Sequence, residues 1–90
     1  MEINADYLIR RTILFDNRCG FALGENPKAP NPYVTWQFNE RDGHRDYFWG
    51  HYHNEPDMAE RDLLNRAEDY QRRYHVLKVE QAPDKETYKY

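Results

Sequence analysis

Two histidines that lie two positions apart are the first candidates for chemistry in this sequence. His51 and His53 belong to a segment that reads as a β-strand, and residues two apart on a strand point to the same side. Both imidazoles could therefore bind one zinc or iron ion. A third ligand would have to come from elsewhere in the chain, such as Asp46, Asp57 or His44, and no HExxH or carboxylate-rich motif supplies one. Packing at the end of the strand is the stronger interpretation, so we expect no metal and no other cofactor.

Aromatic and basic side chains of the same segment could instead bind a single-stranded nucleic acid. Three aromatic residues could stack on bases, and three residues near a turn could contact phosphate: Tyr33, Phe48 and Tyr52, and Arg41, His44 and Arg45. No RNP-like aromatic signature accompanies them. Glu40, Asp42 and Asp46 lie between the basic residues and cancel much of the attraction. Nucleic-acid binding is therefore the alternative hypothesis.

Catalysis finds less support in the sequence. Cys19 stands in an expected turn, and its only sequence-local partner that could activate a thiolate is Arg18. Pairs of carboxylates such as Asp42 and Asp46 mean little without a pocket. The four glycines are not spaced for a phosphate-binding loop. We expect a protein that is not an enzyme.

A β-hairpin over residues 33–53 must position these side chains. Asp42-Gly43 is a pair typical of a type I′ turn, in which both central residues need positive φ. Counting outward from this turn predicts an apolar face on which Trp36 opposes Trp49 and Phe38 opposes Tyr47.

The other face of this hairpin is predicted to be mixed. It places Tyr33 opposite Tyr52, and Phe48 opposite Gln37. These aromatic residues would form a candidate binding patch unless the linker or Leu8 covers them.

A first hairpin precedes this one. Residues 7–15 alternate loosely and read as a strand with Tyr7, Ile9, Ile13 and Phe15 on one face. A turn at residues 17–20 returns the chain so that Phe21 and Leu23 join Ile13 and Phe15. Residues 24–32 contain three prolines and form a linker.

A helix follows the second hairpin. Asn54 is the expected cap, and Pro56 suits the first turn. An apolar stripe then recurs at helical spacing through six residues: Ala59, Leu63, Ala67, Tyr70, Tyr74 and Leu77.

These elements predict an α+β fold, in which an antiparallel sheet of two β-hairpins, about four strands, packs its apolar face against one C-terminal α-helix. Residues 1–79 are expected to form a single domain. Residues 80–90 carry a proline, many charges and no buried pattern, and are expected to be a disordered tail.

Composition limits the class of protein. The 90 residues carry a net charge of −3, so no general cationic field attracts nucleic acid. Mean hydropathy is −1.18, yet eight Tyr and two Trp can build a small aromatic core. A single cysteine cannot form an internal disulfide, which fits a reducing compartment. No apolar run has signal-peptide or membrane-spanning length, so we expect a cytoplasmic protein without a membrane partner.

The sequence also resembles a group of proteins. Residues 6–17, 20–38, 45–52 and 69–74 resemble small uncharacterised proteins carried by conjugative or integrative elements of Gram-positive gut bacteria. This resemblance spans nearly the whole chain through about Tyr74. It implies a mobile-element context, but no activity and no functional residues.

The leading hypothesis is therefore a non-enzymatic protein-interaction module, an accessory protein of a mobile element, that binds a protein partner or a second copy of itself. Its expected surface is the mixed face of the second hairpin, with Tyr33, Phe48 and Tyr52 rimmed by Arg41, His44 and Arg45, because Tyr and Arg commonly anchor protein interfaces.

Overall fold

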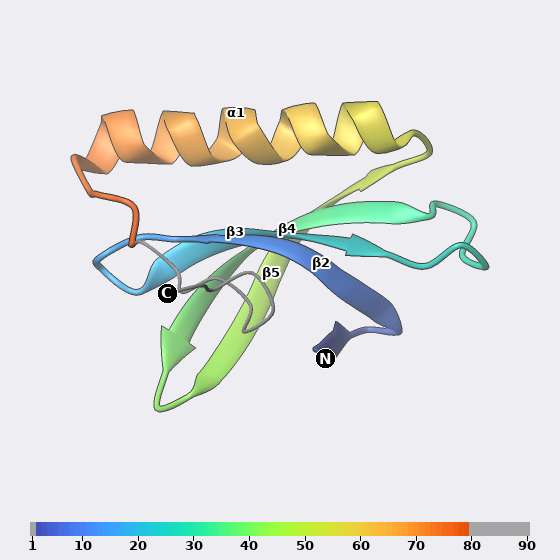
Figure 1. Ribbon diagram of the computed structural model, residues 1–90, viewed down its shortest axis with the longest axis horizontal. Coiled ribbons are helices and arrows are strands. Elements are labelled where there is room, and N and C mark those ends of the chain that lie inside the picture. The colour runs from blue at the N-terminus through green and yellow to red at the C-terminus, as the bar shows by residue number, and fades with distance from the viewer. Residues whose placement is uncertain (1, 80–90) are drawn as a thin grey trace, which may run out of the picture.

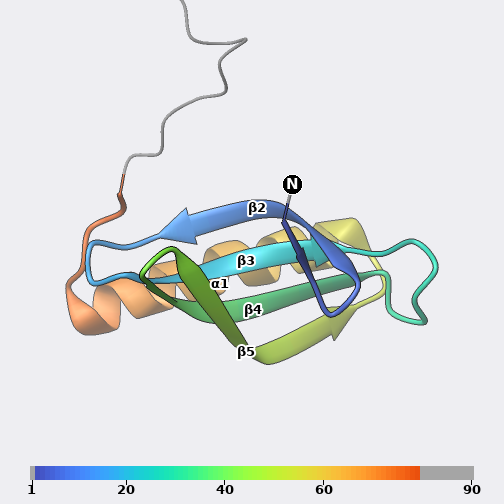
Figure 2. The ribbon, with the colours of Figure 1, turned by 90° about the horizontal axis from the view of Figure 1, so that it is seen from below.

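A computed structural model describes residues 2–79 of the chain (Figure 1). Five strands precede one helix: β1 (Ile3–Asn4), β2 (Tyr7–Leu14), β3 (Cys19–Glu25), β4 (Tyr33–Arg41), β5 (His44–His53) and α1 (Pro56–Tyr74). The strands form a single antiparallel sheet in the order β1-β2-β3-β4-β5, so each strand pairs with its neighbours in sequence (Figure 2).

The expected α+β class, with an antiparallel sheet and one C-terminal helix, is confirmed. The sheet has five strands rather than about four, because the two-residue β1 pairs with the start of β2. After α1 the chain returns to the sheet, where Lys78 forms an isolated bridge with Phe15 and the Val79 N–H donates to the Leu14 carbonyl. The expected tail of residues 80–90 lies outside the described residues.

Helix α1 lies along the outer side of the sheet, over β3, β4 and β5 (Figure 1). Ala59, Leu63 and Ala67 are buried against Ile13, Phe15, Phe21 and Leu23, which confirms that these strand residues share one face. The N-cap is Glu55 rather than the expected Asn54, whose side-chain oxygen instead accepts a hydrogen bond from Asn31 at 2.8 Å. The helix ends at Tyr74, and its C-cap residue, His75, adopts the left-handed conformation.

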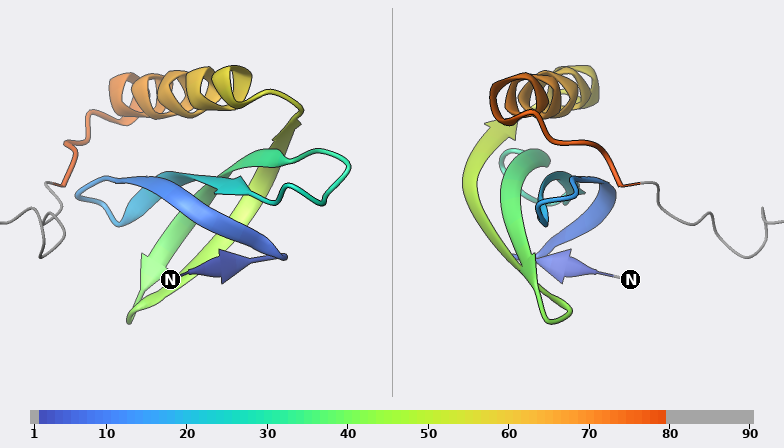
Figure 3. Two further views of the ribbon diagram at one scale, coloured as in Figure 1. Left: turned by 45° about the vertical axis from the view of Figure 1, so that its right-hand side comes forward. Right: turned by 90° about the vertical axis from the view of Figure 1, so that its left-hand side faces the viewer.

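The sheet curls strongly, and its inner side holds a second core (Figure 3). This core is aromatic and aliphatic and consists of Tyr7, Leu14, Ala22, Val34, Trp36 and Phe38. Tyr7 and Tyr47 pack against the Trp36 indole with ring centroids 5.7 and 5.5 Å away. The linker contributes Ala29, so the thin domain fills both sides of its sheet.

The helix therefore covers the face opposite to the one predicted. We expected it on the side of Trp36 and Phe38, but it lies on the side of Thr35, while Trp36 and Phe38 fill the inner core. A bulge on β2 also divides the face predicted for the first strand. The register shifts between Ile9 and Arg11 on β2, so that Ile9 faces the inner core and Ile13 faces the helix.

Side chains from the two ends of the sheet meet across the curl. Glu2, beside β1, accepts hydrogen bonds from Arg45 at 3.0 Å and from the Tyr47 hydroxyl, both on β5. The Tyr7 and Tyr52 rings lie 6.2 Å apart. Among residues 2–79, the sheet is thus closed by side chains rather than by backbone pairing, and β5 is an edge strand.

Candidate functional site

A bulge in β5 presents Trp49 on the surface. From the turn outward the pairing is as predicted, with Arg41 opposite His44 and Gln37 opposite Phe48. The register then shifts, and Thr35 opposes His51 instead of Gly50. Trp49 adopts φ 54°, in the left-handed region, and its side chain is 70% exposed. The predicted Trp36–Trp49 pair is therefore wrong.

Gly50 gives the physical reason for this bulge. A Cβ on Gly50 would lie 3.0 Å from Nε1 of Trp36, so the buried indole uses the space that the missing side chain leaves. Trp36 thus packs over the Gly50 backbone, and Trp49 turns to the other side of the sheet.

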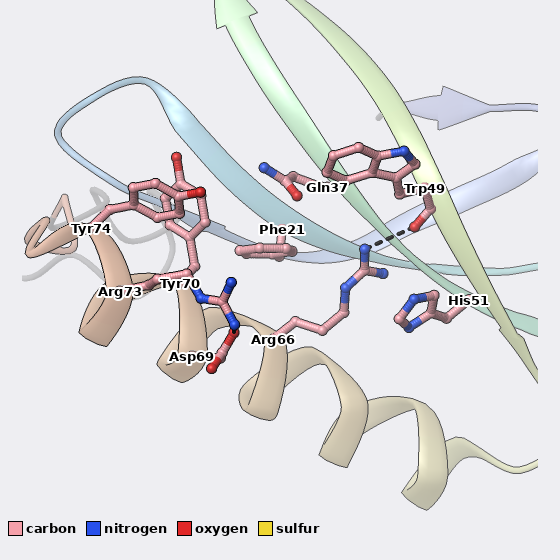
Figure 4. Close-up of a pocket in the computed structure, with 9 residues that line it drawn as sticks. All are labelled: Phe21, Gln37, Trp49, His51, Arg66, Asp69, Tyr70, Arg73 and Tyr74. Carbon is pink, nitrogen blue, oxygen red and sulfur yellow. Dashed lines mark hydrogen bonds and ion pairs between the residues drawn. The ribbon is translucent and has the colours of Figure 1, made fainter.

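Trp49 forms one wall of a cleft between β5 and the C-terminal half of α1 (Figure 4). The cleft has a volume of about 340 Å³ and is lined by aromatic and charged residues: Phe21, Gln37, Trp49, His51, Arg66, Asp69, Tyr70, Arg73 and Tyr74. Trp49 and His51 belong to β5, whereas five lining residues belong to α1: Arg66, Asp69, Tyr70, Arg73 and Tyr74. Tyr74 is 57% exposed and lies over Tyr70, with ring centroids 4.5 Å apart.

A cluster around Asp62 fixes β5 to the helix beside this cleft. The Oδ2 atom of Asp62 accepts a hydrogen bond from the hydroxyl of buried Thr35 at 2.6 Å. The same atom lies 2.9 Å from His51 Nδ1 and 3.2 Å from His53 Nε2. Burial raises the pKa of the Asp62 carboxyl, but the hydrogen bonds from Thr35, His53 and His51 outweigh it, so the pKa lies below its usual range.

Arg66 joins the same cluster to the bulge. Its Nη1 donates to the carbonyl and the hydroxyl of Thr35, both at 3.0 Å, and its Nη2 donates to the Trp49 carbonyl at 2.8 Å. The guanidinium lies 5.3 Å from the centre of the Phe21 ring. Burial lowers the pKa of Arg66 and nearby Asp62 raises it, with a net lowering, but an arginine stays cationic at neutral pH. One side chain therefore fixes the backbone on which Trp49 stands.

The structure separates the three aromatic residues of the predicted patch. Tyr33 packs against the core under the helix, and Phe48 lies beside Trp49 with ring centroids 5.0 Å apart. Tyr52 opposes Val34 and lies on the inner side near Tyr7, because the register shift moves it to the other face. Tyr52 is 54% exposed and, like Trp49, belongs to β5, but it lies on the opposite side of the sheet.

The three residues at the hairpin tip are also divided. Arg41 and His44 are exposed and oppose each other. Arg45 is half-buried on the inner side, where it pairs with Glu2 and Glu40 and lies 4.8 Å from the centre of the Phe38 ring. Arg45 therefore holds the curled sheet together instead of standing beside Arg41.

His51 and His53 share one face, as predicted, but neither Asp46, Asp57 nor His44 joins them. Their common partner is Asp62, which the sequence analysis did not name. Among residues 2–79, no group of three or more His, Cys, Asp and Glu side chains could hold a metal ion. Cys19, at the start of β3, has its thiol 3.0 Å from the Asn39 side-chain oxygen and does not line the cleft.

Sequence reasoning missed Trp49, Arg66 and Tyr74 as site residues. The turn-based register predicts Trp49 on the apolar face opposite Trp36, and the helical spacing predicts Tyr74 in the buried stripe, whereas no sequence pattern distinguishes Arg66 as a site residue. Gly50 inside the strand was the available signal, since an isolated glycine in a strand often marks a bulge.

Comparison with known proteins adds no relative: no family model, no curated protein sequence and no solved structure matches the chain. Within residues 2–79, no helix is long and apolar enough to cross a membrane.

Proposed function

We propose that this protein is a non-enzymatic protein-interaction module that binds an extended segment of a protein partner along β5, with a partner side chain in the cleft beside Trp49. The observation that carries this proposal is Trp49 itself, a large aromatic side chain that is 70% exposed on an edge strand and forms a wall of the cleft. Tryptophan is among the residues that dominate binding energy in protein interfaces.

The backbone of Trp49 supports the same proposal. A non-glycine residue at φ 54° costs about 1–2 kcal/mol relative to a right-handed conformation. Such strain persists where the surrounding structure fixes it, and it often accompanies function. Here Arg66 holds the Trp49 carbonyl, and Gly50 accommodates Trp36. The contacts of Arg66 and Gly50 thus both stabilise the backbone conformation that exposes the Trp49 indole.

The open edge of β5 supplies the second half of the binding surface. Within the described residues, β5 pairs with β4 alone. An edge strand presents unpaired N–H and C=O groups, to which an extended peptide can add as a further strand. Trp49 and Tyr52 border this edge from the two faces of the sheet, so both sides of an added strand would find an aromatic contact.

Single-stranded nucleic acid is the second candidate partner. Trp49 and Tyr74 could stack on bases while Arg73, in the same cleft, contacts phosphate. The net charge of −3 and the Asp69 carboxylate in that cleft favour a protein partner. The mobile-element context remains an expectation from the sequence resemblance.

Affinity capture from host lysate tests the proposal when three tagged proteins are compared: wild type, Trp49→Ser and Met58→Ser. Met58 is 55% exposed and does not line the cleft, so it is a matched surface control. We expect a defined protein that survives nuclease treatment, that binds wild type and Met58→Ser, and that Trp49→Ser loses. The captured protein is then purified and its binding to the three variants is measured directly.

Two outcomes of this capture would contradict the proposal. Recovery that disappears with nuclease would make nucleic acid the partner. Equal binding to wild type and Trp49→Ser by the purified partner would remove the cleft from the interface.

A further inference from the structure

We propose, on the basis of the function proposed above, that the partner side chain in the α1/β5 cleft is acidic, with its carboxylate bound by Arg66 and Arg73 and a neighbouring aromatic or large aliphatic side chain of the partner on Trp49. The partner is thus a peptide segment that pairs a Glu or Asp with an apolar residue.

The bonding of Arg66 gives the first argument. Its three hydrogen bonds go to neutral acceptors, two of them on Thr35 and one on Trp49. A guanidinium has five N–H donors, so Nε–H and one Nη2–H have no acceptor among residues 2–79. The side chain is half-buried in the wall of the cleft, where Figure 4 shows its head between the strand and the helix. A carboxylate can accept two such N–H groups together.

The charge balance of the helix gives the second argument. Arg72 and Arg73 share the single carboxylate of Asp69, at 3.2 and 3.4 Å. Both arginine side chains are about equally exposed, at 69% and 68%, yet Arg73 alone of the two lines the cleft. If Arg73 turns to a ligand, Arg72 still neutralises Asp69. Arg66 and Arg73 can therefore bind one anionic group of a ligand in the cleft.

Asp62, the second carboxylate near Arg66, does not remove this excess of positive charge. Asp62 is the carboxylate whose charge raises the pKa of Arg66, and both side chains contact the Thr35 hydroxyl. The Oδ2 atom of Asp62 is already shared by Thr35, His51 and His53. Arg66 and Asp62 have no direct ion pair within the described residues, so the Arg66 charge is only partly offset.

The aromatic walls specify the neighbouring residue of the ligand. Trp49 and Tyr74 are 70% and 57% exposed, and Phe21 and Tyr70 line the deeper part of the cleft. Covering exposed aromatic surface yields about 25 cal/mol per Å² of apolar area removed from water. A carboxylate alone would leave these rings in water, whereas an adjacent Phe or Leu side chain would cover them.

The test is a titration of the ¹⁵N-labelled protein, followed by NMR, with three blocked peptides, acetyl-Gly-Phe-Glu-Gly-amide and its Gln and Lys counterparts. The two tryptophans supply a reporter and an internal reference. The indole N–H of Trp49 lies at the cleft, whereas Trp36 is buried in the inner core. The Trp49→Ser variant assigns the two signals.

We expect the Glu peptide to shift the Trp49 indole and to bind at least about tenfold more tightly than the Gln peptide, as a charge-assisted pair implies. The Lys peptide should bind more weakly still, and the Trp36 indole should not shift. Arg73→Ala should weaken the Glu peptide about fivefold to tenfold and leave the Gln peptide unchanged. Arg72→Ala, the matched control, should leave the Gln peptide unchanged and weaken the Glu peptide less than Arg73→Ala does, because Arg72 pairs with Asp69 and does not line the cleft.

Equal binding of the Glu and Gln peptides would overturn the acidic-ligand inference, and so would equal effects of Arg72→Ala and Arg73→Ala. No shift with any peptide up to about 10 mM would overturn it too, because that limit corresponds to roughly 3 kcal/mol of binding free energy. In each case the capture experiment with Trp49→Ser still decides the proposed function by itself. A shift of the Trp49 indole caused by a short oligothymidylate and not by the Glu peptide would assign the cleft to nucleic acid.

Discussion

Among single residues, the two tryptophans give the sharpest contrast in this molecule. Trp36 is 5% exposed and contacts Tyr7 and Tyr47, whereas Trp49 is 70% exposed. Trp36→Ala should cost about 3–5 kcal/mol of unfolding free energy, as aromatic truncations in cores do. Trp49→Ala should cost less than about 1 kcal/mol, because surface substitutions have small effects. Urea unfolding of both variants measures this difference.

Equal losses of unfolding free energy in the two variants would contradict the bulge in β5 that exposes Trp49. They would mean that both indoles are buried in one core, as the simple count from the Asp42-Gly43 turn predicted.

The titration of Asp62 should be visible in the stability of the protein at acid pH. The pKa of its carboxyl is lower in the folded chain than its ordinary value of 3.8. Its contribution is therefore present above that ordinary value and is lost as pH falls through the lower, folded pKa. Asp62→Asn should reduce stability by about 1–3 kcal/mol at neutral pH, since Thr35 and two histidines lose their anionic acceptor.

The pH dependence of this variant can be checked by urea unfolding between about pH 6 and pH 3. Stability should fall less steeply below about pH 4 in Asp62→Asn than in wild type. Glu68→Gln, at an exposed position of the helix, is the control and should follow the wild-type slope. Parallel slopes for wild type and Asp62→Asn would contradict the assignment.

At the level of elements, the order of strands and helix was predictable because local signals specify each one. The Asp42-Gly43 turn set the correct pairing as far as Gln37 and Phe48, since short-range geometry alone determines it. The prolines of the linker and the apolar stripe of the helix are also signals within one short segment of the sequence. Ala59, Leu63 and Ala67 are buried as their spacing indicated.

The faces of these elements were not predictable beyond each bulge. A single extra residue moves every later side chain to the other side of the sheet. On β4, Val34, Thr35 and Trp36 are all buried, so alternation gave no contradiction when the helix was assigned to the wrong face. The candidate site depends on that register, and for this reason Tyr33, Phe48 and Tyr52 were grouped while the structure separates them.

The contact between α1 and β5 leads to a prediction about this pair of elements. Arg66 joins the helix to the Thr35 and Trp49 backbones, so Arg66→Met keeps the apolar stem but removes three hydrogen bonds. The expected loss is about 1.5–3 kcal/mol, the range for hydrogen bonds to charged groups. Hydrogen exchange should accelerate at His51 and His53, because the end of β5 loses its attachment to the helix.

Arg61→Met is the control for this experiment. Arg61 lies on the exposed side of the same helix, so neither stability nor exchange in β5 should change beyond about 0.5 kcal/mol. Unchanged exchange in Arg66→Met would show that the bulge holds its shape without the helix.

For the whole molecule, the curl of the sheet depends on residues that are far apart in sequence. Glu2 meets Arg45 and Tyr47 across the two ends of the sheet, and such a contact leaves no local pattern to recognise. The curl also explains how Trp36, Phe38 and Val34 are buried on the side of the sheet away from α1, because the sheet encloses its own inner side (Figure 3). The helix is then available to form the cleft.

Titration of Tyr47 tests this closure of the sheet. Burial and the hydrogen bond to Glu2 raise the pKa of Tyr47 to about 12, although Arg45 opposes the shift. Because the folded pKa exceeds the ordinary value of 10.0, the stability linked to Tyr47 is present below that value and is lost as pH rises toward 12.

In an absorbance titration of the eight tyrosines, Tyr47→Phe should remove the last step. Glu2→Gln should move that step to lower pH, because the uncharged amide no longer disfavours a tyrosinate beside it. A last step that stays in place in Glu2→Gln would mean that the two ends of the sheet do not meet in solution. The sheet would then be open, and the core around Trp36 would rely on the linker alone for its cover.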